Sequence, residues 1–316
     1  MYITSADQLK EFCENLQSAE ILAIDTEFVR ETTYFHRVGL IQVSSGEHCA
    51  AIDPVLLSDL TPMLELFKDP GKIKIFHAAR QDLEILVRMC GQVITPVFDT
   101  QIAAALVGWG AQISFAKIVQ KALGKKIHKS ETYTDWCRRP LSDSQIEYAI
   151  DDVRYLVPVY RKLIERLKKM DRLDWVQGEV KAWEDPQTFA LPEPQKRLLK
   201  IKNLRSLKPR NLTVLNELVA WREREAVKRD CLPKNIIRDE TLLEIARKAP
   251  NDLKILSEFR GFHQRECNKS GASILSVIEM ALQTPDEDLV VLPESSGHTT
   301  VRGVEELLAA YVQIRS

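Results

Sequence analysis

The sequence predicts an α/β protein in which a mixed sheet covered by helices is followed by a second, all-α domain. Short apolar runs that suit strands are concentrated before residue 77, and helical patterns dominate after it, an order typical of a sheet with helices packed on it. A proline-rich stretch, 184–194, then precedes a region with helical patterns alone. The length of 316 residues also exceeds what one compact core usually spans.

Four strands are expected in the first region. Each is a short apolar run, and two carboxylates interrupt the first of them. Gly46 and Glu47, between the second and third runs, predict a hairpin. The expected strands are Ile21–Val29, Val38–Ser44, His48–Ile52 and Lys72–Phe76.

Three helices are expected next. The first spans Ala79–Met89, and a second follows Asp99, which suits an N-cap. The third begins at Ser142, because Ser142-x-x-Gln145 is a capping box followed by an apolar stripe at helical spacing. Pro158 lies inside that stripe and should interrupt the helix.

The chain after residue 183 is divided by composition. We expect a first domain over 1–183, a linker over 184–210, an all-α domain over 211–285 and a C-terminal segment over 286–316. The second half of the linker, 196–210, holds seven basic residues and no acidic one, so it either contacts phosphates or is a solvated linker. The expected helices are 212–227, 240–247, 252–259, 264–282 and Val304–Ile314.

Bulk composition points to a reducing compartment without identifying a partner. The net charge of −1 indicates neither nucleic acid nor membrane. Six scattered cysteines with no CxxC pair indicate neither a zinc site nor a disulfide framework. The N-terminus does not resemble a signal peptide, and no apolar run approaches the roughly 20 residues that span a bilayer. We therefore expect a cytoplasmic protein without a membrane partner.

Four acids in the first region occupy places where a carboxylate is costly. Asp25 and Glu27 leave the same face of the first strand, because they are two residues apart. Asp82 falls on the helix after the fourth strand, and Asp152 lies four residues after Tyr148 on the capped helix, so these two share a helix face. Close carboxylates repel unless a proton or a cation lies between them, and all-oxygen ligands suit Mg²⁺ or Mn²⁺. The pattern predicts a two-metal phosphodiesterase site in which Tyr148 orients the attacking water or positions its proton.

Taken singly, each acid is better explained as a solvated or helix-capping residue. Asp99 is explained as an N-cap, and Asp151 competes with its neighbour Asp152 as a solvated helix residue. The order of the motifs favours a shared site: D-x-E in an apolar strand, an Asp on the next helix, then Y-x₃-D on an amphipathic helix.

These motifs resemble those of the 3′-to-5′ exonucleases named for four acids and a tyrosine (DEDDy). The matching segments are Asp25-Thr-Glu-Phe, His77-Ala-Ala-Arg-Gln-Asp and Tyr148-Ala-Ile-Asp-Asp. The flanking stretches DTEFVRETTYFHRVGLIQV, FDTQIAAALVG and KSETYTDWCRRPLSDSQIEYAIDDVRYL are similar to the bacterial ribonuclease D family, over roughly residues 1–285. The resemblance implies a ribonuclease H-like exonuclease fold for the first domain.

The resemblance also implies roles for individual residues. Asp25, Glu27, Asp82 and Asp152 would bind two divalent cations, Mg²⁺ or Mn²⁺, with Asp25 bridging them and Asp82 acting partly through water. Tyr148 would hold the attacking water. The expected pocket for the 3′-terminal nucleotide and its flank is formed by Thr26, Glu27 and Phe28, with Gln42 and His77 as further candidates. A structural hydrogen bond explains Gln42 and His77 equally well, and His77 stands where many relatives carry an amide.

Residues 212–282 resemble the helicase-and-RNase-D C-terminal (HRDC) domain, through WREREAVKRDCLPKNIIRDETLLEIARKAP, in which Asp239 is expected to cap a helix. The resemblance implies assistance in nucleic-acid binding. The segment 286–316 is either a helix that packs back on the body or the start of a truncated second HRDC domain.

The function that follows is a 3′-to-5′ exoribonuclease that releases mononucleotides from RNA with a free 3′ end, with tRNA precursors as the substrate that the resemblance implies. No obligate protein partner is indicated. A 3′-to-5′ DNA exonuclease is the nearest alternative, since metals and water act alike on either backbone. An RNA-binding protein with an inactive site is the alternative of another class, although all five site residues are present.

Overall fold

The chain is described by a computed structural model that covers residues 1–127, 134–191, 193–293, 304 and 307. It divides into two compact units. The first unit contains Met1–Val29 and His36–Ala190. The second contains Arg30–Phe35 together with the chain from Leu191 onward. The short segment Arg30–Phe35 therefore belongs with the helical second unit although it lies between two strands of the first.

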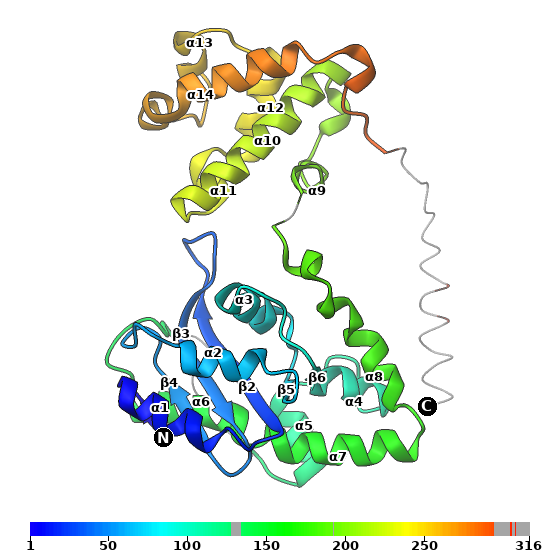
Figure 1. Cartoon of the computed structure of the whole chain (residues 1–316). Helices are drawn as coiled ribbons and strands as arrows, with labels where there is room; N and C mark the ends of the chain where they lie inside the picture. The colour runs from blue at the N-terminus through cyan, green and yellow to red at the C-terminus, as the bar shows by residue number, and fades with distance from the viewer. Residues whose placement is uncertain (128–133, 192, 294–303, 305–306, 308–316) are drawn as a thin grey trace. The chain divides into compact units, whose positions relative to one another are not determined.

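The first unit is built on a six-stranded mixed sheet in the order β1-β4-β3-β2-β5-β6 (Figure 1). The central strand β2 pairs antiparallel with β3 and parallel with β5. The pairing of β3 with β4 is antiparallel, which confirms the predicted hairpin, and its register places Gln42 opposite Ala51. The strands are β1 (Tyr2–Ile3), β2 (Ile21–Val29), β3 (Arg37–Ser44), β4 (Cys49–Ile52), β5 (Ile73–Phe76) and β6 (Val97–Asp99).

The alternation of side chains along β2 defines the two faces of the sheet. Leu22 and Ile24 belong to a core cluster with the helices α1 (Ala6–Asn15), α2 (Thr61–Lys68) and α3 (Arg80–Cys90). Ala23 belongs to a separate cluster with helices that cover the other face. Those helices are α4 (Thr100–Leu106), α5 (Phe115–Leu123), α6 (Asp143–Arg154), α7 (Leu156–Lys169) and α8 (Leu173–Val180). Asp25 and Glu27 follow Ala23 at the period of two, so they share its face.

The predicted elements agree with the structure to within about two residues in the first unit. The capping box of Ser142 and Gln145 is present at the start of α6. The predicted interruption is also present: α6 ends at Arg154 and α7 begins at Leu156, so Pro158 falls in the first turn of α7, where its missing N–H costs little. Asp99 caps α4 by accepting hydrogen bonds from the amides of Gln101 and Ile102, as predicted.

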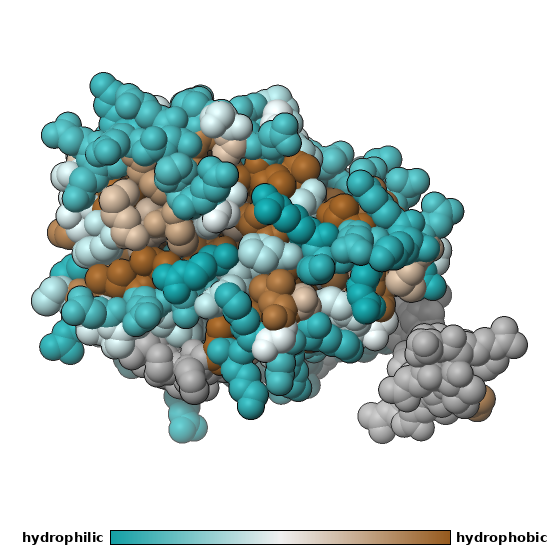
Figure 2. Space-filling view, turned by 90° about the horizontal axis from the view of Figure 1, so that it is seen from below, coloured by the Kyte–Doolittle hydropathy of each residue, from teal (hydrophilic) through white to brown (hydrophobic). Residues whose placement is uncertain are grey.

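Several elements were absent from the prediction, namely β1, α1, α2, β6, α5 and α8. In Figure 1, α5 and α7 lie along the lower edge of the first unit, and Figure 2 views that side of the molecule from below. Two 3₁₀ turns, Lys181–Glu184 and Pro186–Phe189, complete the unit. They carry Trp183 and Phe189 against the core on the α1–α3 face.

The second unit is helical and is organised around α10 (Pro209–Arg229), which packs against α14 (Gln264–Leu282), α12 (Asp239–Lys248) and α9 (Pro194–Leu198). The shorter helices α11 (Pro233–Ile236) and α13 (Leu253–Ser257) complete it. Tyr34 is buried in this core, and its hydroxyl donates a 2.9 Å hydrogen bond to Glu223.

The expected cap at Asp239 is wrong. Arg238 is the N-cap of α12, and Asp239 is the first residue of the helix. The Asp239 carboxylate instead pairs with the buried guanidinium of Arg222 at 2.7 Å, from the first turn of the helix. The predicted helix Val304–Ile314 lies almost entirely outside the described residues. Within the described part of the chain, no helix is both long enough and apolar enough to cross a membrane.

Candidate active site

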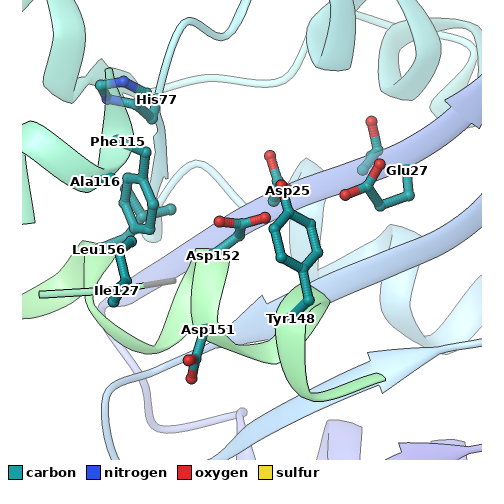
Figure 3. Close-up of a pocket in the computed structure, with 11 residues that line it drawn as sticks. Asp25, Glu27, His77, Phe115, Ala116, Ile127, Tyr148, Asp151, Asp152 and Leu156 are labelled. Atoms are coloured by element: carbon teal, nitrogen blue, oxygen red, sulfur yellow. The ribbon is translucent and has the colours of Figure 1, made fainter. Parts of the chain in front are cut away.

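Three predicted acids meet on the α6 side of the sheet. Asp25 and Glu27 come from β2, and Asp152 comes from α6. Each offers a carboxylate oxygen, and these three oxygens all lie within 4.8 Å of one another. Figure 3 shows Asp25 between the other two, with Tyr148 beside it. Strand and helix thus deliver four of the five predicted catalytic side chains to one place.

The acids are held in a setting that opposes their ionisation. Burial, followed by the charges of Asp82, Asp152 and Glu27, raises the pKa of Asp25 well above its ordinary value. Burial, followed by the charges of Asp152 and Asp82, raises the pKa of Glu27 to about 8. A hard divalent cation binds oxygen ligands of this kind and relieves the repulsion between them. The residues present therefore fit Mg²⁺ or Mn²⁺.

Asp82 reaches the site from the other side of β2. It comes from α3, whose apolar residues pack on the opposite face of the sheet from Asp25. Its carboxylate accepts a 2.5 Å hydrogen bond from the hydroxyl of Thr26, the strand residue between Asp25 and Glu27. Burial raises the pKa of Asp82 to about 6, although the bond from Thr26 opposes that rise. Asp82 is close enough for its charge to act on Asp25, but its role as a ligand stays a prediction.

Tyr148 faces the acids rather than solvent. Figure 3 shows its ring in front of Asp25, and its hydroxyl hydrogen-bonds to Asp152 on the next turn of α6. Burial and the charges of Asp152, Glu27 and Asp25 raise the pKa of Tyr148. The phenol therefore stays protonated at neutral pH, so it can hold a water by hydrogen bonding but is a poor base.

The sequence prediction did not include Trp136, which supports Tyr148 from behind. The two rings stack with centroids 6.1 Å apart and an interplanar angle of 27°. Trp136 is buried, and its carbonyl accepts a 2.8 Å hydrogen bond from Arg139. Arg139 in turn forms a two-pronged pair with the buried Asp53, at 2.5 and 2.7 Å. No local pattern could have found this contact, since it joins a loop to a helix.

A cavity of about 290 Å³ opens beside the acids. Besides the predicted residues, it is lined by Phe115, Ala116, Ile127, Asp151 and Leu156. Asp151 remains outside the cluster, because its carboxylate pairs with Arg154 at 2.5 Å and points away from Asp25 in Figure 3. Phe115 comes from α5, a helix that the sequence prediction missed.

His77 lines the same cavity, but the protein occupies both of its ring nitrogens. Nδ1 lies 2.9 Å from the hydroxyl of Thr100, and Nε2 lies 3.0 Å from the carbonyl of Ile113. Burial lowers the pKa of His77, so the neutral ring donates from Nε2 and accepts at Nδ1. Of the two interpretations left open for His77, this geometry favours the structural hydrogen bond.

Gln42 is the opposite case. Its register position on β3 is directly opposite Asp25, and its side chain is fully buried. Among the described residues, neither Oε1 nor Nε2 of Gln42 has a hydrogen-bond partner. A buried, unpartnered amide is costly for stability alone, but Gln42 is not among the residues that line the cavity, so its role towards a bound group stays a prediction.

The two remaining candidates for the nucleotide pocket differ in position. Thr26 lines the cavity and bonds to Asp82, whereas Phe28 packs edge-on against His36, with ring centroids 4.7 Å apart. Phe28 follows a register shift between Glu27 and Phe28, and it is not among the residues that line the cavity. A substrate contact by Phe28 remains a prediction.

Comparison with known proteins agrees with this geometry. Residues 1–168 match the 3′-5′ exonuclease domain family, and residues 211–278 match the HRDC domain family. Ribonuclease D of Gluconacetobacter diazotrophicus is 40% identical over 286 residues, which cover 90% of this chain and 72% of the relative. Ribonuclease D of Granulibacter bethesdensis is 39% identical over 93% of this chain and 74% of its own length.

Solved structures give the same result. The crystal structure of Escherichia coli RNase D, described as an exoribonuclease involved in structured RNA processing, aligns with a TM-score of 0.87 and 33% identity, over 99% of this chain and 84% of its own. The catalytic core of RRP6 from Trypanosoma brucei aligns with a TM-score of 0.68 at 23% identity, over 89% of this chain and 79% of its own, a likeness of fold. The chain therefore belongs to the ribonuclease D family of hydrolytic 3′-5′ exoribonucleases.

Proposed function

We propose that this chain removes 5′-mononucleotides one at a time from the 3′ end of RNA by two-metal-ion hydrolysis at Asp25, Glu27, Asp82 and Asp152. The observation that carries the proposal is the convergence of Asp25, Glu27 and Asp152 within 4.8 Å, with Tyr148 bonded to Asp152. A solvated surface acid would not lie half-buried against two others. Thr26 adds support, because its hydroxyl holds Asp82 at the edge of the same cluster.

The protein residues divide the work by position. Asp25 lies between Glu27 and Asp152, and these three carboxylates would hold the divalent cations (Figure 3). Bound Mg²⁺ or Mn²⁺ would supply charge stabilisation for the attacking and leaving oxygens. Tyr148, as a neutral phenol, holds the attacking water in line by hydrogen bonding. The apolar side chains of Phe115, Ile127 and Leu156 offer a contact surface for the terminal nucleoside.

The substrate class follows from the family, and its finer identity is our proposal. The Escherichia coli relative is described as acting in structured RNA processing. By likeness we infer that precursor tRNA with a 3′ trailer, in the cytoplasm, is a substrate of this chain. The seven basic residues of 196–210 would assist by contacting phosphates, although Arg197 and Arg210 also pair with Glu223 and Asp286 inside the second unit.

The experiment that tests the proposal compares RNA with DNA, and oligomers labelled at the 3′ end with oligomers labelled at the 5′ end. Matched RNA and DNA oligomers, labelled at either end, are incubated with the full chain in Mg²⁺, Mn²⁺ or EDTA. We expect the 3′ label to leave at once as a mononucleotide, the 5′-labelled RNA to shorten as a ladder, and EDTA to stop both. Internal cleavage, or equal activity in EDTA, would contradict the proposal. Faster cleavage of DNA than of RNA would make DNA the substrate.

The tRNA assignment has its own test. A transcript that carries a tRNA followed by a 3′ trailer is compared with an unstructured RNA of equal length. We expect trimming to stop near the acceptor stem in the first and to continue through the second. Equal degradation of both would leave the exonuclease intact and remove the tRNA assignment.

A further inference from the structure

A second hollow in the first unit surrounds Trp109. It consists of two adjoining cavities, of about 710 Å³ and 450 Å³. Trp109 and Lys121 line both of them, which makes the two cavities neighbours. We call this hollow the Trp109 groove and define it by Trp109, Lys117, Lys121, Lys162, Arg166 and Lys169.

The groove is positively charged in a chain that is otherwise balanced. The stretch from Phe115 to Lys126 and helix α7 together carry nine basic side chains and one acidic side chain, Glu165. The whole chain has 44 basic and 45 acidic residues, so this concentration is local. Hydrophilic side chains cover most of the side seen in Figure 2, and hydrophobic groups show between them. The nine basic residues are Lys117, Lys121, Lys125, Lys126, Arg161, Lys162, Arg166, Lys168 and Lys169.

Trp109 is flanked by two of these cations. The Lys121 ammonium lies 5.7 Å from the centroid of the ring, and the Arg166 guanidinium lies 5.1 Å from it. Cation–π attraction accounts for these two contacts as local packing. It does not account for the cavities on either side of the ring, nor for Lys117. Lys162 and Lys169 pair with Glu165, at 3.8 and 2.7 Å, and Glu165 lines the smaller cavity with them. Aromatic rings interleaved with basic side chains are the usual lining of grooves that bind single-stranded nucleic acid.

The groove is joined to the acidic cavity by consecutive residues. Ile113 and Ser114 line the larger cavity of the groove, and the next two residues, Phe115 and Ala116, line the cavity beside the acids. His77, at the far side of the acidic cavity, fixes this connection through its hydrogen bond to the carbonyl of Ile113. An RNA strand that leaves the acids past Phe115 would therefore meet the Trp109 groove next.

We propose that the Trp109 groove binds the single-stranded RNA that lies 5′ of the nucleotide being removed. This inference rests on the proposed function, because it takes the acidic cavity as the position of the 3′ end. The lysines neutralise backbone phosphates, and Trp109 with Arg166 offers a stacking surface to bases. The groove would then lower KM for longer RNAs and leave the chemical step unchanged.

The test compares substrates of two lengths with the full-length chain. A dinucleotide occupies the acidic cavity alone, whereas an oligoadenylate of about twelve nucleotides also fills the groove. In the double variant Lys121→Glu, Arg166→Glu we expect KM for the oligoadenylate to rise about tenfold, with kcat unchanged. The kinetics of the dinucleotide should not change. The slope of log KM against log salt concentration should flatten by about 0.7 for each phosphate that the variant no longer neutralises.

A matched control comes from α7, the helix that carries Arg166. Arg161 and Lys168 are exposed on α7 but line neither cavity of the groove. The variant Arg161→Glu, Lys168→Glu makes the same change in net charge, so it should alter KM for the oligoadenylate far less. If both double variants raise KM for the oligoadenylate equally, only the net charge of the protein matters, and the inference is overturned.

Substitutions of Trp109 test the groove without changing the net charge. Trp109→Leu should raise KM for the oligoadenylate several-fold, whereas Trp109→Phe should retain most of the affinity. A variant that is merely unfolded would lose activity on the dinucleotide as well. If the wild type degrades neither substrate, the proposed function fails. If it degrades both and the groove variants leave KM for the oligoadenylate unchanged, only the groove fails.

Discussion

Trp136 stacks on Tyr148 at 6.1 Å between ring centroids, and the Trp136 backbone is held by Arg139 and Gly39. A Cβ at Gly39 would come within 2.3 Å of the Trp136 carbonyl oxygen, so only glycine permits this approach. Arg139 also donates a 2.6 Å hydrogen bond to the Gly39 carbonyl. The catalytic candidate Tyr148 is therefore backed by a platform of Trp136, Arg139 and Gly39, which joins two distant segments of the chain.

Replacement of this platform should slow turnover without weakening substrate binding. We expect Trp136→Leu to lower kcat about tenfold to a hundredfold, because a small displacement of Tyr148 misplaces the attacking water. KM for a dinucleotide should stay near the wild-type value, and Trp136→Phe should restore most of the rate. Steady-state kinetics on the dinucleotide measure both quantities.

Trp221, an equally buried tryptophan of the second unit, provides the control for a loss of stability alone. Trp221→Leu should lower the free energy of unfolding by about 2–4 kcal/mol. Its melting temperature should therefore fall about as far as that of Trp136→Leu. Its kcat on the dinucleotide should not change. If both variants lose turnover equally, Trp136 does not act through Tyr148.

Tyr148→Phe separates water positioning from metal binding. Removal of the hydroxyl deletes the bond to Asp152 and the proposed contact to water, yet leaves every carboxylate in place. We expect kcat to fall by about a hundredfold or more, with Mn²⁺ affinity within about threefold of wild type. Titration calorimetry with Mn²⁺ checks the second expectation, and a loss of bound metal would refute the assigned role.

Gln42→Leu should trade function for stability. The buried amide of Gln42 has no partner among the described residues, so an apolar side chain of similar size should raise the free energy of unfolding by about 1 kcal/mol without metal. The same change should lower turnover, because the amide can no longer hold a bound group beside Asp25. A thermal melt in EDTA and an activity assay test the pair of outcomes. Unchanged activity would restore the purely structural interpretation.

The acidic site should make the metal-free protein less stable as pH rises. The pKa of Glu27 is about 8 in the folded chain against an ordinary value of 4.5, so folding retains a proton that the unfolded chain releases. This contribution is fully present below about pH 4.5 and is lost as pH rises through about 8. Asp25 and Asp82 act with the same sign.

Mg²⁺ should reverse that trend, since it binds the deprotonated acids and its affinity rises with pH. Melting temperatures in EDTA and in Mg²⁺ across this range test both statements, and Glu27→Gln should flatten part of the EDTA curve. A metal-free melting temperature that rises through the same range would contradict the assignment.

Local patterns recovered the elements that carry the acids. The apolar run of β2, the capping box at Ser142 and the break before Pro158 are all encoded by near neighbours in the sequence. Helix α1 has a capping box of the same kind, Ser5 with Gln8, so near neighbours in the sequence encode its start as well. The short strands β1 and β6 depend on partners in the sheet rather than on their own sequence.

Contacts between distant segments could not be predicted in this way. The stacking of Trp136 on Tyr148 and the connection from Ile113 to His77 both join segments that no local period relates. Asp99 was correctly expected to cap α4, but it also accepts hydrogen bonds from the amides of Ala78 and Ala79, which required the fold. The position of Asp82 behind Thr26, rather than among the other three acids, likewise follows from the face of the sheet on which α3 packs.

We propose above that Asp25 and its neighbours hydrolyse RNA from the 3′ end with bound metal. The most direct measurement is the release of mononucleotides from a 3′-labelled RNA in Mn²⁺ by the wild type, Asp25→Asn and Asp152→Asn. Both substitutions keep the size of the side chain and remove a charge from the cluster. We expect each to lower the rate by at least about a thousandfold, with folding checked by a cooperative thermal melt. Undiminished release by either variant would contradict the assignment of Asp25 and Asp152 to the hydrolytic site.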